Sequence, residues 1–184
     1  FAGGISTDCF GQDLWDASVA AGLDMRFMQR YDNPPLLAIV HSTRPVKYFF
    51  IGNDSADLHF DPAALPAGWM QHVKWAHFGG ISLTREPLAS RLVALAEQLK
   101  KAGARIAYDP NFRVTMTEQY DATLEKMASI ADVIKISDED LVGLFRTPDQ
   151  DAAFAKLRRF NPGAVYLYTS GADGASLHVG DEAW

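Results

Sequence analysis

The stretch Tyr108-Asp109-Pro110-Asn111-Phe112-Arg113 decides how the rest of the chain is interpreted. It follows a short apolar run that begins at Ile106, and it places an acid, an amide and a guanidinium where a strand should end. In an open α/β sheet, ligands bind in the crevice beyond the carboxyl ends of the strands, so polar groups there are candidates for function. Asp-Pro-Asn is also ordinary turn chemistry, because proline fixes φ and Asp or Asn bonds the nearby backbone. On this stretch alone, the turn is favoured.

Two later strands are predicted to end in the same way. An apolar run over 133–136 leads into Lys135-Ile136-Ser137-Asp138-Glu139-Asp140-Leu141, and a run over 164–169 leads into Thr169-Ser170-Gly171-Ala172-Asp173-Gly174-Ala175. Ser137 can cap a short helix with acids in its first turn, as the helix dipole prefers. Right-handed crossovers put the carboxyl ends of successive parallel strands on one edge of the sheet. The three loops are therefore predicted to converge on one crevice.

The predicted crevice combines hydrogen-bond donors, cations and acids. The donors and cations are Asn111, Arg113, Lys135, Ser137 and Thr169. The acids, which could hold Mg²⁺ directly or through waters, are Asp109, Asp138, Glu139 and Asp140. Gly171 and Gly174 would let the backbone approach a ligand closely. This mixture predicts a site for a nucleotide or phosphate bound with its metal.

Strands and helices alternate through most of the remaining chain. Near the start, a strand over 1–5 precedes a helix in which Leu14, Ala17 and Ala21 are expected to face the core. Further along, helical spacing of apolar residues predicts helices over 88–99 and 124–131, and another helix is expected over 149–160. These helices alternate with strands over 75–78, 105–108, 133–136 and 164–169. This pattern is typical of an α/β fold.

One β-rich segment interrupts the alternation between residues 25 and 60. The apolar runs Leu36–Val40 and Tyr48–Ile51 are separated by residues typical of a hairpin turn. Those turn residues are Ser42, Thr43, Arg44 and Pro45. The segment is interpreted either as a small subdomain laid over a site or as a plain edge hairpin.

Composition limits the function classes. The chain has 184 residues, 48% of them apolar, which suits one sizeable core plus an appendage. Its net charge is -6 and it has no basic run, so nucleic acid is not expected as a partner. The single cysteine, Cys9, excludes an internal disulfide or a thiolate metal cage and fits a cytoplasmic protein. No apolar stretch reaches membrane-spanning length, and neither GxxxxGK[ST] nor GxGxxG occurs. The five histidines lack zinc-ligand spacing.

Six ordered segments resemble the PfkB or ribokinase-like carbohydrate kinases, and within them the fructokinases. The segments are GGISTDCFGQDL (3–14), DSADLHF (54–60), AHFGGISLTREP (76–87), AYDPNFR (107–113), ADVIKISDEDL (131–141) and YTSGADGAS (168–176). The resemblance implies a ribokinase-like three-layer αβα fold with a mostly parallel central sheet. Residues 1–24 and 61–184 would form the kinase core. Residues 25–60 would form a β lid over the sugar, which often makes a dimer contact, so a homodimer is expected.

By this resemblance, the protein would be an ATP-dependent sugar kinase that transfers the γ-phosphoryl group to a sugar hydroxyl. Fructose is the expected sugar, with 2-keto-3-deoxygluconate or ribose as alternatives. Mg²⁺ is the implied ion, and K⁺ is a further candidate on which the sequence is silent. Arg113 would stabilise charge on the transferring group. The residues implied around ATP and its metal are Asn111, Lys135, Ser137, Asp140, Thr169, Ser170, Gly171 and Gly174, with Asp140 as the metal ligand.

The chain departs from the family pattern at several positions. The second lid strand usually ends in Tyr-Arg, whereas Ile51 and Gly52 stand here, so an arginine that could grip a sugar acid is missing and a neutral sugar is favoured. Ser137 and Asp140 replace the Asn and Glu of many members. The family's first strand and its Gly-Ala-Gly-Asp motif with the catalytic base are expected beyond residues 1–184. A non-catalytic nucleotide- or sugar-binding module is the alternative from another class.

Overall fold

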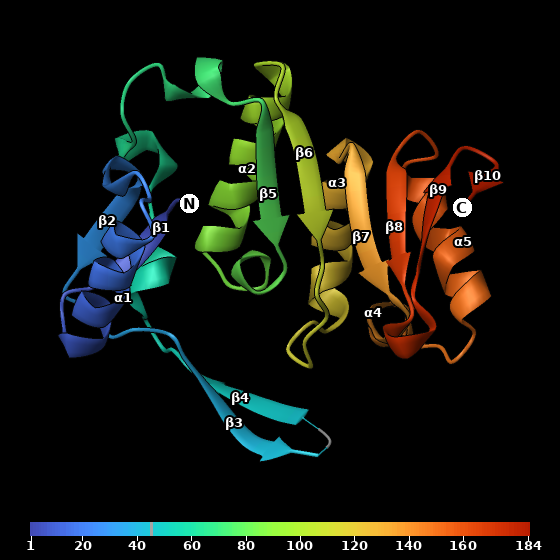
Figure 1. Ribbon diagram of the computed structural model, residues 1–184, viewed down its shortest axis with the longest axis horizontal. Coiled ribbons are helices and arrows are strands. Elements are labelled where there is room, and N and C mark those ends of the chain that lie inside the picture. Colours follow the sequence, from blue (N-terminus) through green and yellow to red (C-terminus); the bar gives the residue numbers. More distant parts are fainter. Residues whose placement is uncertain (45) are drawn as a thin grey trace. The chain divides into compact units, whose positions relative to one another are not determined.

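The computed structural model describes residues 1–44 and 46–184 and forms two compact units, Phe1–Ala67 and Gly68–Trp184 (Figure 1). Each unit is described by itself below. The division into a core of 1–24 plus 61–184 and a lid of 25–60 stays a prediction. No helix among the described residues has the length and apolar character that crossing a membrane requires.

The first unit holds one βαβ element and one hairpin. Strands β1 (Gly3–Ser6) and β2 (Met28–Tyr31) pair in parallel, and helix α1 (Cys9–Ala20) connects them. Strands β3 (Leu37–Thr43) and β4 (Val46–Ile51) form a separate antiparallel pair. Short 3₁₀ helices lie at Met25–Phe27, Ala56–His59 and Pro62–Ala64.

Helix α1 forms where it was predicted, but it turns a different face to β1. Leu14, Ala17 and Ala21 are exposed, whereas Gly11 and Ser18 are buried. The cause is a close approach, because a Cβ at position 11 would overlap the carbonyl of Ser6. The expectation that Leu14, Ala17 and Ala21 face the core was therefore wrong, since small residues, not apolar ones, mark the packed face.

The β3–β4 hairpin confirms the predicted pair of strands. Ile39 lies opposite Phe49 and Val40 opposite Tyr48, with a register irregularity between Val40 and Ser42. Of the expected turn residues, Pro45 lies outside the described part of the chain.

The second unit is a mixed sheet in the order β10-β9-β8-β7-β6-β5. Four strands run parallel, namely β5 (Trp75–Gly79), β6 (Arg105–Asp109), β7 (Val133–Ser137) and β8 (Val165–Thr169). Strands β9 (Ala175–Val179) and β10 (Glu182–Ala183) extend the sheet, and both pairings, β8 with β9 and β9 with β10, are antiparallel. The helices between these strands are α2 (Leu88–Lys101), α3 (Asp121–Ile130), α4 (Asp138–Phe145) and α5 (Gln150–Phe160). The predicted alternation is confirmed.

The core of this unit lies between the sheet and the helices, which lie behind the strands in Figure 1. Alternate residues of β6 and β7 point into it, as the strand period requires, and so do the predicted faces of α2 and α3. On the strands, Trp75, Leu167 and Leu177 stay exposed. The second helical layer of the expected three-layer fold stays a prediction for this unit.

Candidate functional site at the carboxyl edge of the sheet

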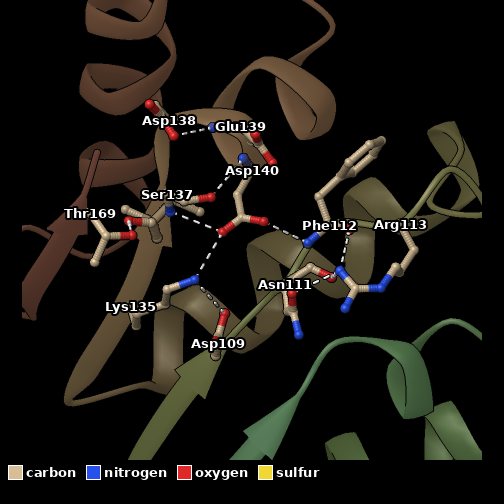
Figure 2. Close-up of polar contacts among 11 residues, drawn as sticks. Asp109, Asn111, Phe112, Arg113, Lys135, Ser137, Asp138, Glu139, Asp140 and Thr169 are labelled. Carbon is tan, nitrogen blue, oxygen red and sulfur yellow. Dashed lines mark hydrogen bonds and ion pairs between the residues drawn. The ribbon is translucent and has the colours of Figure 1, made fainter. Parts of the chain in front are cut away.

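The register of the sheet brings the three predicted loops to one edge. Strands β6, β7 and β8 are adjacent and parallel, and Ser137 at the end of β7 lies opposite Thr169 at the end of β8. On the other side, Asp109 at the end of β6 lies opposite Gly79. Figure 2 shows side chains from all three strand ends. The shared edge follows from the parallel order, and it confirms the prediction that the loops lie together.

The loop after β6 turns sharply because two positions have special backbone requirements. Asn111 has φ 45°, a left-handed conformation that asparagine adopts more readily than most residues. The carbonyl of buried Pro110 packs against Gly80, where a Cβ would overlap it. Any larger residue at position 80 would therefore push the loop away from β5.

Asp140 is the most heavily bonded carboxylate of the site. It is 5% exposed, and Oδ1 accepts a hydrogen bond of 2.7 Å from the backbone N–H of Phe112. Oδ2 accepts 2.9 Å from the backbone N–H of Ser137, whose hydroxyl in turn accepts 3.0 Å from the N–H of Asp140. This reciprocal pair is a capping box, so the predicted capping of α4 by Ser137 is confirmed.

Lys135 lies between two carboxylates. Its ammonium donates to Asp140 Oδ2 at 3.4 Å and lies 3.6 Å from Asp109 Oδ1 (Figure 2). Its side chain is 32% exposed, so the group also faces solvent. Asp109 Oδ1 is buried, and no described residue donates a hydrogen bond to it. The Lys135 ammonium can bind an anionic ligand, and Asp109 Oδ1 can accept a hydrogen bond from a ligand hydroxyl. Because the lysine and the carboxylates already balance each other, neither leaves an unpaired buried charge when no ligand is bound.

Arg113 is folded back onto its own loop. Its Nη1 donates 2.7 Å to the side-chain oxygen of Asn111, 2.7 Å to the carbonyl of Phe112 and 3.0 Å to the carbonyl of Asn111 (Figure 2). These bonds use one of the two terminal nitrogens of a planar group that presents five N–H donors. The structure therefore brings Asn111 and Arg113 together, as predicted, in an arrangement that fixes the direction of the guanidinium.

Two buried tyrosines close the base of the same loop. The hydroxyl of Tyr108, in β6, lies 2.5 Å from the hydroxyl of Tyr120, which precedes α3. Burial raises the pKa of Tyr108 well above its ordinary value, and nearby Tyr120, Asp109 and Asp140 raise it further. Burial also raises the pKa of Tyr120, to about 12, although the bond with Tyr108 lowers it. Both groups are neutral at physiological pH and act as a structural pair.

The loop after β8 depends on glycine. Gly171 has φ 52° and Gly174 has φ 101°, conformations that residues with a Cβ adopt rarely. The N–H of Ser170 donates 2.9 Å to the carbonyl of Gly174, which closes the loop. Thr169 lies at its start, and its hydroxyl donates a long bond of 3.5 Å to the carbonyl of Ile136. Gly171 and Gly174 are thus required by the positive φ angles of this loop. The contacts of the loop with a nucleotide stay a prediction.

The arrangement does not provide a ready metal site at Asp140. Each of its oxygens already accepts a backbone N–H, and Lys135 Nζ lies 3.4 Å from Oδ2, so a cation bound there would share the carboxylate with the chain's own donors and would lie near the charge of Lys135. Within residues 1–44 and 46–184, no group of three or more His, Cys, Asp or Glu side chains could hold a metal ion. Asp140 as a metal ligand stays a prediction.

Sequence reasoning missed the glycines that pack against the loop after β6. The ring of Phe112 lies over Gly143 of α4, where a Cβ would overlap the ring. A glycine inside a helix costs about 1 kcal/mol relative to alanine, so its presence in an eight-residue helix was a signal of close packing. Gly80 carried the same signal at the end of β5.

The fold and the site define an α/β protein in which polar and charged side chains gather at the carboxyl edge of a parallel sheet. The model of the pfkB family carbohydrate kinases matches residues 1–184, and the chain belongs to that family. It is 30% identical to the fructokinase of Klebsiella pneumoniae over 186 aligned positions, which cover 95% of this chain and 58% of that protein. It is 34% identical to the probable chloroplastic fructokinase-6 of Arabidopsis thaliana over 141 positions, 73% of this chain and 36% of that protein.

A solved structure agrees with these relatives. The ATP-bound fructokinase of Xylella fastidiosa superposes with a TM-score of 0.87 at 26% identity, covering 100% of this chain and 59% of that one. The predicted ribokinase-like fold and the resemblance to fructokinases are confirmed. The chain spans about a third to three-fifths of the length of these relatives.

Proposed function

We propose that the protein is an ATP-dependent sugar kinase that transfers the γ-phosphoryl group of ATP to a hydroxyl of fructose. The observation that carries this proposal is the pair of cations, Lys135 and Arg113, fixed with Asn111 at the carboxyl edge of a parallel sheet in a pfkB-family chain. The relatives named above are fructokinases, which supports fructose as the sugar. Ile51 and Gly52, in place of Tyr-Arg, support a neutral sugar over a sugar acid.

The proposed chemistry is an in-line displacement. A bond forms between the sugar oxygen and the γ-phosphorus while the bond from that phosphorus to the departing ADP oxygen breaks, and the hydroxyl proton passes to a base. Catalysis of such a transfer is mainly positioning and stabilisation of charge. Arg113 is proposed to stabilise the charge on the transferring group, since a planar guanidinium can pair two phosphate oxygens at once.

The nucleotide is proposed to extend from this cluster along the loop after β8. Lys135 and Asn111 would contact phosphate oxygens, and the exposed backbone around Gly171 and Gly174 would allow a planar base or a ribose to approach without a side chain in the way. Ser137, Asp140, Thr169 and Ser170 complete the residues predicted around ATP. Ser137 and Asp140 already bond each other, so their contribution is the shape of this edge.

Mg²⁺ is proposed as the counter-ion of ATP, with K⁺ as a further possible ion. Mg²⁺ usually keeps several waters and binds through substrate phosphates plus one or two carboxylates, and bound there it would neutralise charge on the phosphates. Because both Asp140 oxygens already accept bonds from the chain's backbone, no step of the transfer is derived through a metal on this residue.

A homodimer through the β3–β4 hairpin is proposed on the exposure of its side chains. Val40 is 51%, Phe49 47% and Ile51 53% exposed, and the hairpin carries apolar residues on both faces. A two-stranded hairpin is marginally stable alone, so such residues are expected to be covered in an assembly. The lid role of residues 25–60 and a cytoplasmic location, suggested by the single cysteine, stay predictions.

The proposed function is tested by sugar-dependent release of ADP from ATP. Fructose, ribose and 2-keto-3-deoxygluconate are offered in parallel, with ATP alone as the control for hydrolysis by water. Release that depends on fructose supports the fructokinase proposal. Release with only one of the other sugars keeps the kinase class and overturns the sugar, and ATP binding without release under any condition would favour the non-catalytic module.

A further inference from the structure

We propose that Asp140 is a positioning residue whose carboxylate holds the loop carrying Asn111 and Arg113 against the first turn of α4. The proposal assigns this acid to the loop rather than to a cation. The proposal depends on the proposed function only in the test that measures turnover. The contact between Asp140 and the loop can be tested without any enzymatic activity.

The first support is that each oxygen of Asp140 accepts a hydrogen bond from the backbone. Oδ1 accepts from the N–H of Phe112, in the loop after β6, and Oδ2 accepts from the N–H of Ser137, at the end of β7. One buried carboxylate thus joins two neighbouring strand ends. Hydrogen bonds to a charged group contribute more than neutral ones, and they are stronger where water is excluded.

The second support is that the charge is balanced within the chain. Lys135 Nζ lies 3.4 Å from Asp140 Oδ2, so the buried carboxylate keeps an ionic partner when the site holds no ligand. Among the acids of this cluster, Asp109 has a buried oxygen without a hydrogen bond, whereas Asp140 has none.

The third support is a second contact between the same two elements. The ring of Phe112 packs on Gly143, one turn further along α4, where any Cβ would overlap it. Asp140 holds the Phe112 backbone and Gly143 admits its ring, so the two contacts act on one residue. Phe112 stands between Asn111 and Arg113, and its carbonyl accepts from Arg113 Nη1, so a shift of Phe112 moves the guanidinium directly.

Two substitutions disturb this contact from opposite sides. Asp140→Asn keeps the size of the side chain but replaces one acceptor oxygen with an NH₂ donor. That donor would face the backbone N–H of Phe112 or of Ser137, so one of the two hydrogen bonds would be lost. Gly143→Ala pushes the Phe112 ring away without touching any charge, and alanine favours the helix itself, so α4 is not weakened. Glu139→Gln is the matched control, because it removes a negative charge from the same helical turn at an exposed position.

The first test is amide hydrogen exchange of the purified protein without ligands. In the unmodified protein, the Phe112 N–H is expected to be protected, and Asp140→Asn is expected to speed its exchange about 10- to 100-fold, the loss of a bond to a charged acceptor. Gly143→Ala is expected to speed it as well, and Glu139→Gln to leave it unchanged. Because both substitutions act on one contact, the double variant should exchange no faster than the faster single variant.

The proposal is overturned if the Phe112 N–H exchanges without protection in the unmodified protein. This measurement does not depend on the folding of any variant. It is also overturned if Asp140→Asn leaves that exchange unchanged, or if the effects of Asp140→Asn and Gly143→Ala simply add.

The second test applies once turnover with ATP and a sugar has been observed. A displaced guanidinium is expected to lower kcat about 10- to 100-fold in both Asp140→Asn and Gly143→Ala, with the Mg²⁺ concentration for half-maximal rate unchanged. If Asp140 instead binds the metal, Asp140→Asn alone will require more Mg²⁺, and its defect will be relieved by adding it. That outcome overturns the positioning role. Absence of any turnover would count against the proposed function only, because the exchange results stand independently.

Discussion

The strand-end cluster of the second unit and the β3–β4 hairpin of the first unit are built in opposite ways. In the cluster, Lys135 and Asp140 are fixed by ion pairs and hydrogen bonds to neighbouring strand ends, above a packed core. In the hairpin, Phe49 and Ile51 each lie opposite a residue of β3, but both side chains remain about half exposed. The difference teaches that contacts within the second unit organise the strand-end cluster, whereas the hairpin leaves apolar side chains exposed, which is why we propose that a partner covers them.

The largest effect is expected at Arg113. Arg113→Ala is predicted to lower kcat about 10²- to 10³-fold, the usual cost of removing a donor that stabilises charge in a transition state. Arg113→Lys should recover only part of the rate, because an ammonium lacks the planar pair of donors. Steady-state kinetics with ATP and fructose measure both.

The matched control for this prediction lies at the start of β6, the strand that leads into the loop of Arg113. Arg105 is an exposed arginine at the start of β6, stacked on Trp75, and Arg105→Ala should leave kcat unchanged. An equal loss in both variants would mean that net charge, rather than the strand-end position, matters.

The next effect concerns the base of the cluster. Tyr108→Phe is predicted to lower the free energy of unfolding by about 1–3 kcal/mol, because the buried hydroxyl of Tyr120 loses its partner. The double variant Tyr108→Phe/Tyr120→Phe should be closer to the unmodified protein than the sum of the single losses. Urea unfolding of the four proteins measures this coupling, and strictly additive losses would show that the pair does not act as one unit.

A smaller effect should appear in alkaline solution. Burial raises the pKa of Tyr120 to about 12 and also raises that of Tyr108 well above its ordinary value, so both stay protonated in the folded protein while unfolded tyrosines ionise near 10.0. Above that pH the unfolded state binds fewer protons, so stability is complete below pH 10 and falls by up to about 1.4 kcal/mol per pH unit for each tyrosine. Unfolding curves between pH 9 and pH 11 measure the slope. The slope should be shallower in the double variant, and an identical slope would contradict the assignment.

The smallest effect on stability is expected for a substitution in the hairpin. The same substitution is expected to have a large effect on assembly. Phe49→Lys is predicted to change the free energy of unfolding by no more than about 0.5 kcal/mol, as for other exposed positions. The same substitution should convert the proposed dimer to monomers in sedimentation velocity. Thr43→Lys adds the same charge to the hairpin without removing an apolar side chain and should leave the dimer intact. A dimer that survives Phe49→Lys would place the interface elsewhere.

Much of the second unit could be predicted from the sequence because its signals are local. The spacing of Leu95, Ala96 and Leu99 defines the buried face of α2, and Ser137 with Asp140 follows the pattern of a capping box. The parallel order then places the strand ends together without further information.

The contacts that were not predicted depend on approaches between distant segments. Nothing near Gly143 in the sequence indicates that Phe112 lies over it, and nothing near Gly11 indicates that α1 touches β1 through small residues. The bond that Asp140 Oδ1 accepts from Phe112 was hidden for the same reason, because its donor is a backbone N–H that no side-chain pattern reveals. Glycines within helices were the only trace that these approaches left.

The measurement that tests the central claim most directly is amide hydrogen exchange of the protein with and without ATP. The account predicts slower exchange in three segments at the carboxyl edge of the sheet, 109–113, 135–140 and 169–174, and no change in the β3–β4 hairpin. Protection by ATP confined to other segments, or no protection anywhere under conditions where ATP binds, would contradict the claim that this edge is the phosphate site.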